Sequence, residues 1–322
     1  MSDIRQPHAQ IVFLTYLNRS GSTYLASKLD GYETVKVGIE ARFVDGWIIP
    51  GFAVRTVQEL HSYIDTLYKD TKFQAWNIQR NELLNLLTDL PLPLCFSDIL
   101  QAALSLYRGS SSGQHILIHK CGEYYRCVER IRQDLSGAKF IFINRDPRAV
   151  FNSQRRSMDS RTGQPMQKSI LHFLFGYLDT LQRLEVLQHD PGFLVVQYEE
   201  LIANEVDVMR GIKKFLELSP TNQQFDKTDY FASIPQGQRH LHQHVQNGDP
   251  CSDRVSGWKQ ELPVPYILLL QTVLKKYLRK KGFSFYSPAK ITLPALGQFI
   301  ILLCMYWYEL VKRKLFGIEH RY

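Results

Sequence analysis

The segment IVFLTYLNRSGSTYLASKLD, residues Ile11–Asp30, decides the fold that the sequence predicts. It begins with an apolar, β-branched run, Ile11–Leu14, passes through a small polar turn, Asn18–Thr23, and becomes helical in period from Tyr24 onward. A turn that leads into a helix N-terminus presents unpaired backbone N–H groups and the positive end of the helix dipole. The order strand, turn, helix therefore predicts an α/β unit with an anion-binding loop.

The side chains of this turn suit an anion, but they do not match the motif of nucleoside-triphosphate enzymes. Arg19 supplies a fixed charge, and Ser22 and Thr23 supply hydroxyl donors. The motif G-x-x-x-x-G-K-[ST] would place its first glycine on Tyr16 and its lysine on Ser22 if Gly21 were its second glycine. A P-loop kinase or NTPase is therefore kept only as an alternative. For the turn taken alone, ordinary helix capping is the simpler interpretation.

Composition indicates a globular chain with anionic partners. The 322 residues are 44% hydrophobic, enough for one large or two small domains, and the net charge is +8 with a pI near 9.1. Such a charge suits a phosphorylated cofactor, an anionic membrane surface or nucleic acid. The densest basic clusters, Lys275–Lys281 and Lys312–Lys314, form no long arm, so nucleic acid is not expected as a partner.

The cysteines and the N-terminus indicate a cytoplasmic protein. The five cysteines are odd in number and widely spaced, match no zinc pattern and suit a reducing compartment. The first ten residues contain no apolar run typical of a signal peptide. We therefore expect a cytoplasmic location, with membrane association through the C-terminal tail as an open alternative.

A carboxylate and a helical block follow the opening unit. Glu40 comes just after a short predicted strand, where catalytic groups of open α/β folds collect, although such a glutamate is more often a solvated side chain. Helical patterns then begin at Thr56, cover Arg80–Leu87, and follow Ser97 to near Gly109. We interpret residues 52–112 as a helical insertion that covers the site.

A second candidate phosphate site follows two further predicted strands. His115–Lys120 predicts a strand that ends in a lysine, followed by a helix over Tyr124–Leu135. Lys139–Asn144 predicts a buried strand. Pro147 then begins a helix with Asp146 as its N-cap.

The end of that strand and the helix carry groups that suit a phosphate. Arg145 stands at the strand end, and Ser153 and Ser157 share one face of the helix. The alternative is that R-D-P-R is a helix-start signal with local Asp–Arg pairing, and the segment alone does not decide between the two interpretations.

Four segments together resemble the sulfotransferases that use 3′-phosphoadenosine 5′-phosphosulfate (PAPS), in their carbohydrate or bacterial-type branch. R-S-G-S-T at Arg19–Thr23 resembles the 5′-phosphosulfate loop, and R-D-P-R-A-V-x-x-S, about 125 residues later, resembles the 3′-phosphate segment. Phe193–Leu201 resembles the V-x-Y-E-D-L strand, and Arg254–Leu262 resembles the R-x-x-G-x-W-K loop that closes over the cofactor. The resemblance covers Ile11 to about Phe283.

The resemblance implies a fold, a domain division and a co-substrate. The expected fold is α/β, a P-loop-like three-layer fold with a central, mostly parallel sheet flanked by helices, plus a C-terminal helical tail. The sulfotransferase domain is expected at 1–283 and a hydrophobic and basic tail at 284–322. PAPS is the expected co-substrate, and no metal is expected. The residues implied in binding it are Arg19, Ser20, Gly21, Ser22, Thr23, Tyr24, Arg145, Ser153, Arg254, Gly257, Trp258 and Lys259.

The resemblance also implies a mechanism, the transfer of the sulfuryl group from PAPS to a hydroxyl acceptor with a carboxylate as general base. Glu40 resembles the glutamate of the bacterial G-x-P-E-Y-F segment, with Ile39 in place of the proline, and His119 is the reserve base. Lys120 resembles the lysine of the E-K-[ST]-P segment, which stabilises the bridging oxygen, although its neighbours here differ. The expected acceptor is a carbohydrate, a glycolipid or a lipid. An inactive, membrane-associated PAPS-binding homologue is a further alternative.

Several other features are assigned to packing or left without chemistry. The amphipathic segments Ser169–Gln188 and Glu205–Leu218 are predicted to be packing helices. Aromatic residues such as Phe43, Trp47 and Trp76 would suit a sugar or lipid acceptor, but core packing is the commoner role. For His240, His242 and His244 we prefer a polar loop beside the cofactor over a metal site, because no carboxylate or cysteine set accompanies them.

The C-terminal tail carries the longest apolar run. Phe299–Tyr308 is uninterrupted, but a spanning helix needs about 20 predominantly apolar residues, so a membrane span is marginal. Trp307 and Tyr308, followed by Lys312–Lys314, suit a helix at an anionic membrane interface. We favour peripheral membrane contact through 291–314, or docking on the domain or on a second subunit, over a true anchor.

Overall fold

The computed structural model describes most of the chain. The described residues are 10–41, 43, 45–49, 51–108, 116–159, 162–219, 230–234, 236–239 and 253–317. His240, His242 and His244 lie outside them, so the loop predicted there is not described. The chain divides into two compact units, which are described separately. Unit 1 comprises Met1–Asn144, Asp190–Val196 and Asn204–Asp249, and unit 2 comprises Arg145–His189, Gln197–Ala203 and Pro250–Tyr322.

Unit 1 is built on a five-stranded sheet with the strand order β2-β3-β1-β4-β5. The strands are β1 (Gln10–Tyr16), β2 (Val35–Val37), β3 (Ile116–Lys120), β4 (Lys139–Asn144) and β5 (Phe193–Gln197), whose last residue is counted with unit 2. β1 pairs in parallel with both β3 and β4, and β2 pairs in parallel with β3. Central β1 is buried from Ile11 to Tyr16, as expected for a strand covered on both faces.

Aromatic packing around β1 supplies much of this core. The Phe13 ring stacks on Phe140 of β4 at 5.1 Å and meets Tyr124 edge-on at 4.8 Å. Because the strands are parallel, their carboxyl ends lie at one edge of the sheet. Tyr16, Val37, Lys120 and Asn144 therefore end their strands at the same edge.

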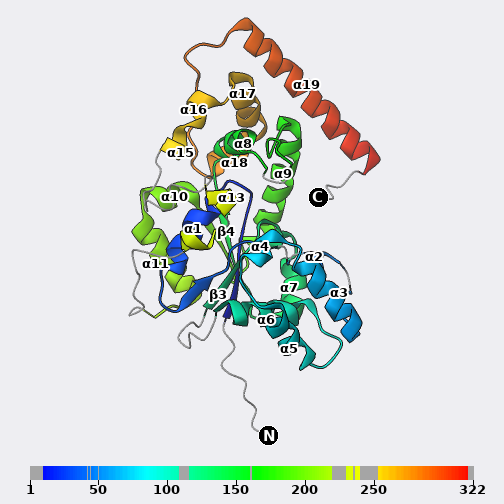
Figure 1. Ribbon diagram of the computed structural model, residues 1–322. Coiled ribbons are helices and arrows are strands. Elements are labelled where there is room, and N and C mark those ends of the chain that lie inside the picture. Colours follow the sequence, from blue (N-terminus) through cyan, green and yellow to red (C-terminus); the bar gives the residue numbers. More distant parts are fainter. Residues whose placement is uncertain are drawn as a thin grey trace. The chain divides into compact units, whose positions relative to one another are not determined.

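Helices flank the sheet of unit 1. They are α1 (Ser22–Asp30), α2 (Asp45–Ile48), α3 (Val57–Leu67), α4 (Thr71–Gln74), α5 (Arg80–Thr88), α6 (Phe96–Arg108), α7 (Val128–Asp134), α11 (Glu205–Leu216), α12 (Tyr230–Ser233) and α13 (Gln236–Arg239). In Figure 1, α1 lies on one side of the strands and α6 and α7 on the other. The three helices predicted between 52 and 112 are present as α3, α5 and α6, and Thr56 caps α3 by accepting the Glu59 N–H at 3.1 Å.

The prediction of a helix over Tyr124–Leu135 is wrong in its first third, residues 124–127. A 3₁₀-helix, η1 (Gly122–Arg126), comes first, and α7 begins only at Val128. The cause is Thr15 on β1, whose hydroxyl accepts the Tyr125 N–H at 3.0 Å and donates to the Gly122 carbonyl at 2.8 Å. These contacts tie η1 to the sheet, and they use groups that an α-helix would need for its own hydrogen bonds.

Unit 2 is helical. It contains α8 (Pro147–Arg156), α9 (Ile170–Leu187), α10 (Tyr198–Ala203), α15 (Asp253–Ser256), α16 (Trp258–Glu261), α17 (Val264–Val273), α18 (Lys275–Lys280) and α19 (Leu293–Phe316). Asp146 caps α8 by accepting the Arg148 N–H at 2.9 Å, and Pro147 occupies the first helical position, as predicted. Figure 1 shows the long α19 beside α17, and these two helices are in contact.

The predicted fold class is confirmed: an α/β fold with a central parallel sheet, flanking helices and a C-terminal helix. The two predicted packing helices are present as α9 and α11. The predicted division into residues 1–283 and 284–322 stays a prediction.

Candidate active site

The ends of two strands and the start of a helix in unit 1 bring together residues far apart in the sequence. Lys120, the last residue of β3, donates a hydrogen bond of 2.9 Å from Nζ to the Thr23 hydroxyl in the first turn of α1. The same Nζ lies 5.4 Å from the centre of the Tyr16 ring at the end of β1. A buried cation thus lies against the helix start that follows the anion loop.

The loop between β1 and α1 has the backbone of an anion site. Arg19 and Gly21 both adopt left-handed conformations, with φ values of 73° and 93°. Gly21 occupies the N-cap position and has no side chain with which to cap α1. A glycine N-cap leaves the first-turn N–H groups of a helix, with the positive end of its dipole, uncapped by its own side chain. A left-handed arginine is uncommon, and strained residues of this kind cluster at ligand-binding sites.

The other side chains of the loop are largely buried. Ser20, Ser22 and Thr23 are each less than a tenth exposed. The Tyr24 ring is buried, and its hydroxyl donates to the Glu205 carboxylate. Tyr24, which the resemblance implied in cofactor binding, therefore anchors α1 to α11.

Glu40 follows β2 and forms an ion pair that the sequence did not predict. Its Oε1 lies 2.9 Å from Nζ of Lys72 on α4, and the Glu40 side chain is 31% exposed. Burial acts to raise the pKa of Glu40, but the charges of Lys72 and Lys120 and the hydrogen bond from Lys72 outweigh it and leave that pKa lowered. Glu40 is thus an ionised carboxylate at neutral pH, as a general base must be.

The segment just before Glu40 is held in place by the insertion. The Trp76 indole N–H donates to the Ile39 carbonyl at 3.1 Å, and the Gly38 N–H donates to the Ile118 carbonyl of β3 at 2.8 Å. A side chain at Gly38 would come within 3.2 Å of the Trp76 ring. Glu40 therefore follows a fixed backbone.

The pKa of Lys120 is lower than that of an ordinary lysine. Its side chain is 6% exposed, and burial lowers its pKa to about 8, although the Glu40 carboxylate opposes this change. Lys120 is therefore mainly charged at pH 7, and it loses its proton a little above physiological pH.

His119, the reserve base, lies within an aromatic cluster. Successive strand residues point to opposite faces of a sheet, so His119 and Lys120 face different surroundings. His119 is fully buried, its Nδ1 is hydrogen-bonded to the Tyr124 hydroxyl, and the Phe43 and Trp76 rings lie 5.2 and 5.4 Å from its ring. Burial lowers its pKa to about 3, so the imidazole is neutral. Phe43, Trp47 and Trp76 are themselves buried and pack the core.

In unit 2, Arg145 follows β4 directly and is held on two sides. Its guanidinium lies 4.5 Å above the Tyr198 ring and donates to the Arg254 carbonyl, and its carbonyl lies 3.3 Å from the Tyr177 hydroxyl. Burial lowers its pKa from the usual arginine value. Tyr198 belongs to the segment that resembles the V-x-Y-E-D-L strand, so a residue of that motif helps to position Arg145.

Arg148 pairs with Asp146, and this is the local Asp–Arg pairing that the sequence analysis kept as an alternative for the segment. It donates from Nε and Nη2 to the Asp146 carboxylate at 2.9 and 2.7 Å, and its guanidinium lies 4.1 Å from the Trp258 ring. It also donates to Gln271 Oε1 at 2.8 Å and to the Ser284 carbonyl at 3.0 Å. The sequence did not single out Arg148, which joins α8 to α16 and α17.

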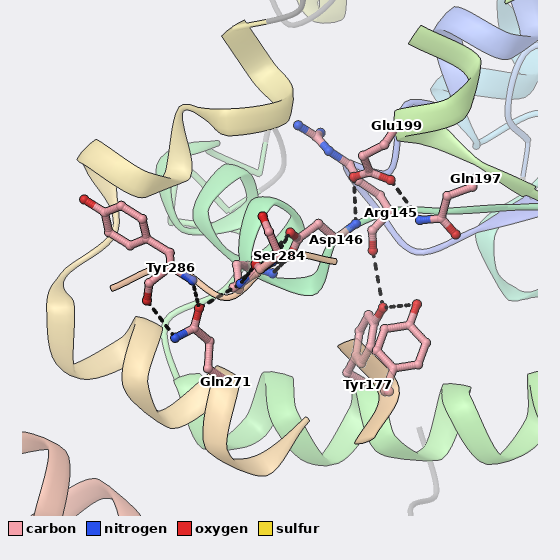
Figure 2. A network of polar contacts seen from close by, with 10 residues as sticks. Arg145, Asp146, Tyr177, Gln197, Glu199, Gln271, Ser284 and Tyr286 are labelled. Carbon is pink, nitrogen blue, oxygen red and sulfur yellow. Dashed lines mark hydrogen bonds and ion pairs between the residues drawn. The ribbon is translucent and has the colours of Figure 1, made fainter. Parts of the chain in front are cut away.

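Figure 2 shows the polar network around this pair. Glu199 accepts the Asp146 N–H at 2.9 Å and a hydrogen bond from the Gln197 amide at 2.8 Å, and burial raises the Glu199 pKa. Gln271 accepts the Tyr286 N–H at 2.7 Å and donates to the Tyr286 carbonyl at 3.0 Å. This network fixes the start of α8, which places Arg145 and Ser153.

The remaining predicted residues of unit 2 lie on α8 and on the α15–α16 segment. Ser153 is half-buried on α8, Arg254 is exposed on α15, and Lys259 is half-buried on α16. Gly257 separates α15 from α16, and a Cβ atom there would lie 2.9 Å from the Asp253 carbonyl. Trp258 is buried against Arg148 and Tyr286.

Each unit therefore gathers part of the predicted set. Unit 1 holds Arg19–Thr23, Glu40, His119 and Lys120, and unit 2 holds Arg145, Ser153 and Arg254–Lys259. Within the part of the chain that the structure describes, no group of three or more His, Cys, Asp or Glu side chains is arranged to hold a metal ion.

Comparison with known proteins identifies the class. The model of the Sulfotransferase family matches residues 11–222. The sulfotransferase domain from the curacin biosynthetic pathway has a similar structure, with a TM-score of 0.56 and 18% identity over 88% of this chain and 100% of that one. The sulfotransferase domain of the Synechococcus PCC 7002 olefin synthase has a TM-score of 0.52 and 17% identity over 94% and 97% of the two chains. A search of curated proteins found no match.

The chain belongs to the sulfotransferase family. The prediction of a PAPS-dependent sulfotransferase is confirmed at the level of the family, and the two solved domains support the fold.

Proposed function

We propose that this enzyme transfers the sulfuryl group of PAPS to a hydroxyl acceptor, with Glu40 as the general base. One observation carries the proposal. An ionised carboxylate, Glu40, lies just after β2, and a buried cation, Lys120, ends the adjacent strand β3 at the sheet edge where the loop Arg19–Thr23 begins. That arrangement supplies an acceptor for a proton and a positive charge beside a phosphate cradle.

The two phosphate-bearing ends of the donor are assigned to separate sets of residues. The loop Arg19–Thr23 holds the 5′-phosphosulfate through backbone N–H groups, the α1 dipole and the Arg19 charge. Arg145 and Ser153 hold the 3′-phosphate by charge and hydroxyl donation. The segment Arg254–Lys259 closes over the adenosine, with Gly257 allowing its tight turn.

In the proposed transfer Glu40 and Lys120 handle the proton and the developing charge without a metal. Glu40 accepts the proton of the acceptor hydroxyl as the acceptor oxygen forms a bond to sulfur. The bond between sulfur and the bridging oxygen breaks, and the charge that develops on the 5′-phosphate is stabilised by Lys120. The products are a sulfate ester and adenosine 3′,5′-bisphosphate (PAP). His119 is the weaker candidate for the base, because its imidazole is fully buried.

For the acceptor we propose a carbohydrate, a glycolipid or a lipid. The free cysteines among the described residues suit a reducing, cytoplasmic location. Contact of residues 291–314 with a membrane would bring the enzyme to a surface that carries lipid-linked acceptors. Phe43, Trp47 and Trp76 are buried in packing, so a stacking platform for a sugar is not assigned to them.

The test is transfer of labelled sulfate from PAPS into a fractionated extract of the source cells, with lipid and water-soluble fractions compared. The expected result is labelled product with the wild-type chain and none with Glu40→Gln, although this variant still binds PAP. Transfer by Glu40→Gln at the wild-type rate would remove Glu40 as the base. PAP binding with no transfer to any fraction would favour an inactive homologue, and phosphoryl transfer from ATP would favour a kinase.

A further inference from the structure

The C-terminal helix α19 presents two opposite faces with different surroundings. Its 24 residues, Leu293–Phe316, are capped by Thr292, whose hydroxyl accepts the Ala295 N–H. The inner face packs on the rest of unit 2: the Tyr306 ring stacks on Phe175 of α9 at 5.3 Å, and the Arg313 guanidinium lies 4.2 Å above the same ring. α19 is thus a docked helix.

The face opposite Tyr306 is apolar and exposed. At about 100° per residue, one stripe contains Ile300, Ile301, Cys304, Tyr308, Val311 and Leu315, and all six side chains are exposed. We call these six residues the outer stripe. Lys312 and Lys314 fall on its two flanks, and Trp307 lies at its border and is 56% exposed. The apolar stripe thus has cations on both sides near one end.

This chemistry fits the surface of an anionic membrane. Tyrosine and tryptophan collect at the depth of the lipid headgroups, and flanking lysines extend their charges toward anionic headgroups while their stems remain apolar. By length and composition alone α19 could also cross a bilayer. A crossing helix, however, would have to give up the contacts of Tyr306 and Arg313 with Phe175, whereas a helix lying flat keeps them.

We propose that α19 is an interfacial membrane helix that lays its outer stripe into an anionic bilayer while its inner face stays on α9 and α17. Such a helix buries one apolar face at the boundary of headgroups and acyl chains. The inference deepens the proposed membrane contact by naming its surface and its lipid class. It does not depend on Glu40 or on the identity of the acceptor.

The test is co-sedimentation of the full-length chain with vesicles of phosphatidylcholine alone or mixed with phosphatidylserine. We expect binding that needs phosphatidylserine and weakens at high salt. Ile301→Glu should reduce binding at least tenfold. Val186→Glu, at a similarly exposed valine on α9, should leave it unchanged. Replacing both Lys312 and Lys314 with alanine should weaken binding about 30-fold, from about 1 kcal/mol per lysine.

Tryptophan fluorescence gives a second, independent measurement. Trp47, Trp76 and Trp258 are buried, so Trp307 is the tryptophan that lipids can reach. Brominated phosphatidylcholine, mixed into the anionic vesicles, should quench the wild-type emission and leave Trp307→Phe unaffected. Retained PAP binding would show that each variant is folded.

Four results would overturn the inference. The first is failure of the wild-type chain to bind anionic vesicles, and the second is binding by Ile301→Glu as tight as that of the wild type. The third is resistance of the bound protein to alkaline extraction, which marks a spanning helix. The fourth is a dimer in solution that Ile301→Glu dissociates. The last would assign the outer stripe to a second copy of the chain. None of them bears on the PAPS site, which PAP binding measures separately.

Discussion

Glu40 Oε1 and Lys72 Nζ lie 2.9 Å apart, so a residue of the helical insertion holds the proposed catalytic base. Lys72 lowers the pKa of Glu40, and a base must be ionised to accept a proton. Activity should therefore fall as the pH falls through the Glu40 pKa. Lys72→Met should raise that pKa and move the acidic limb of the kcat/KM profile to higher pH.

The matched control for this prediction is Lys72→Arg, which keeps the charge and should keep the acidic limb near its wild-type position. PAP affinity, measured in parallel, should hardly change in either variant. An acidic limb that does not move in Lys72→Met would show that Glu40 is not the group that titrates.

Lys120 should set the alkaline limit of the reaction. Burial lowers its pKa to about 8 in the free protein, so kcat/KM should decline as the pH rises through about 8 and the stabilising charge is lost. Lys120→Met should lower kcat about 10²–10³-fold, the usual effect of removing one group that stabilises developing charge. Lys120→Arg, which stays charged, should remove the alkaline limb near pH 8. Retention of that limb in both variants would assign it to another group.

Arg148 should matter for stability, and Ser153 for binding. Arg148 and Asp146 form a buried ion pair with side chains 1% and 6% exposed, so Arg148→Met leaves an uncompensated buried carboxylate. The expected loss is about 3–5 kcal/mol in the free energy of unfolding, measured by urea denaturation. An Arg148→Met variant as stable as wild type would contradict the structural role given to this pair.

The free energy of unfolding of Ser153→Ala should stay within about 0.5 kcal/mol of the wild-type value, while its PAP binding should weaken.

The sequence predicted the elements well where local chemistry decides them. Residues Lys139–Asn144 and the Asp146–Pro147 start of α8 were predicted without error, because an apolar run, a capping aspartate and a proline act on their own neighbours. Gly21 and the loop around it were found for the same reason. The helix after β3 was misjudged because Thr15, more than a hundred residues away, accepts the Tyr125 N–H.

The partners of the site residues could not be predicted because they are long-range. Lys120 and Thr23 are 97 residues apart and Arg148 and Gln271 are 123 apart, and no periodicity links such positions. Lys72 lies in a four-residue helix, too short to give a pattern, so its pairing with Glu40 had no signal in the sequence. The motifs pointed to the loop Arg19–Thr23 and to the strand-end residues. Only the fold brought in Lys72, and only the fold showed which residues Tyr198 and Glu199 contact.

The most direct test that this site binds PAPS is calorimetric titration of the chain with PAP, adenosine 5′-monophosphate and ATP. PAP should bind most tightly. Loss of the 3′-phosphate should weaken binding about ten- to a hundredfold, because hydrogen bonds to charged groups contribute about 1.5–3 kcal/mol. Ser153→Ala should weaken PAP binding but leave binding of the monophosphate unchanged. Tighter binding of ATP than of PAP would contradict the assignment of this site to PAPS.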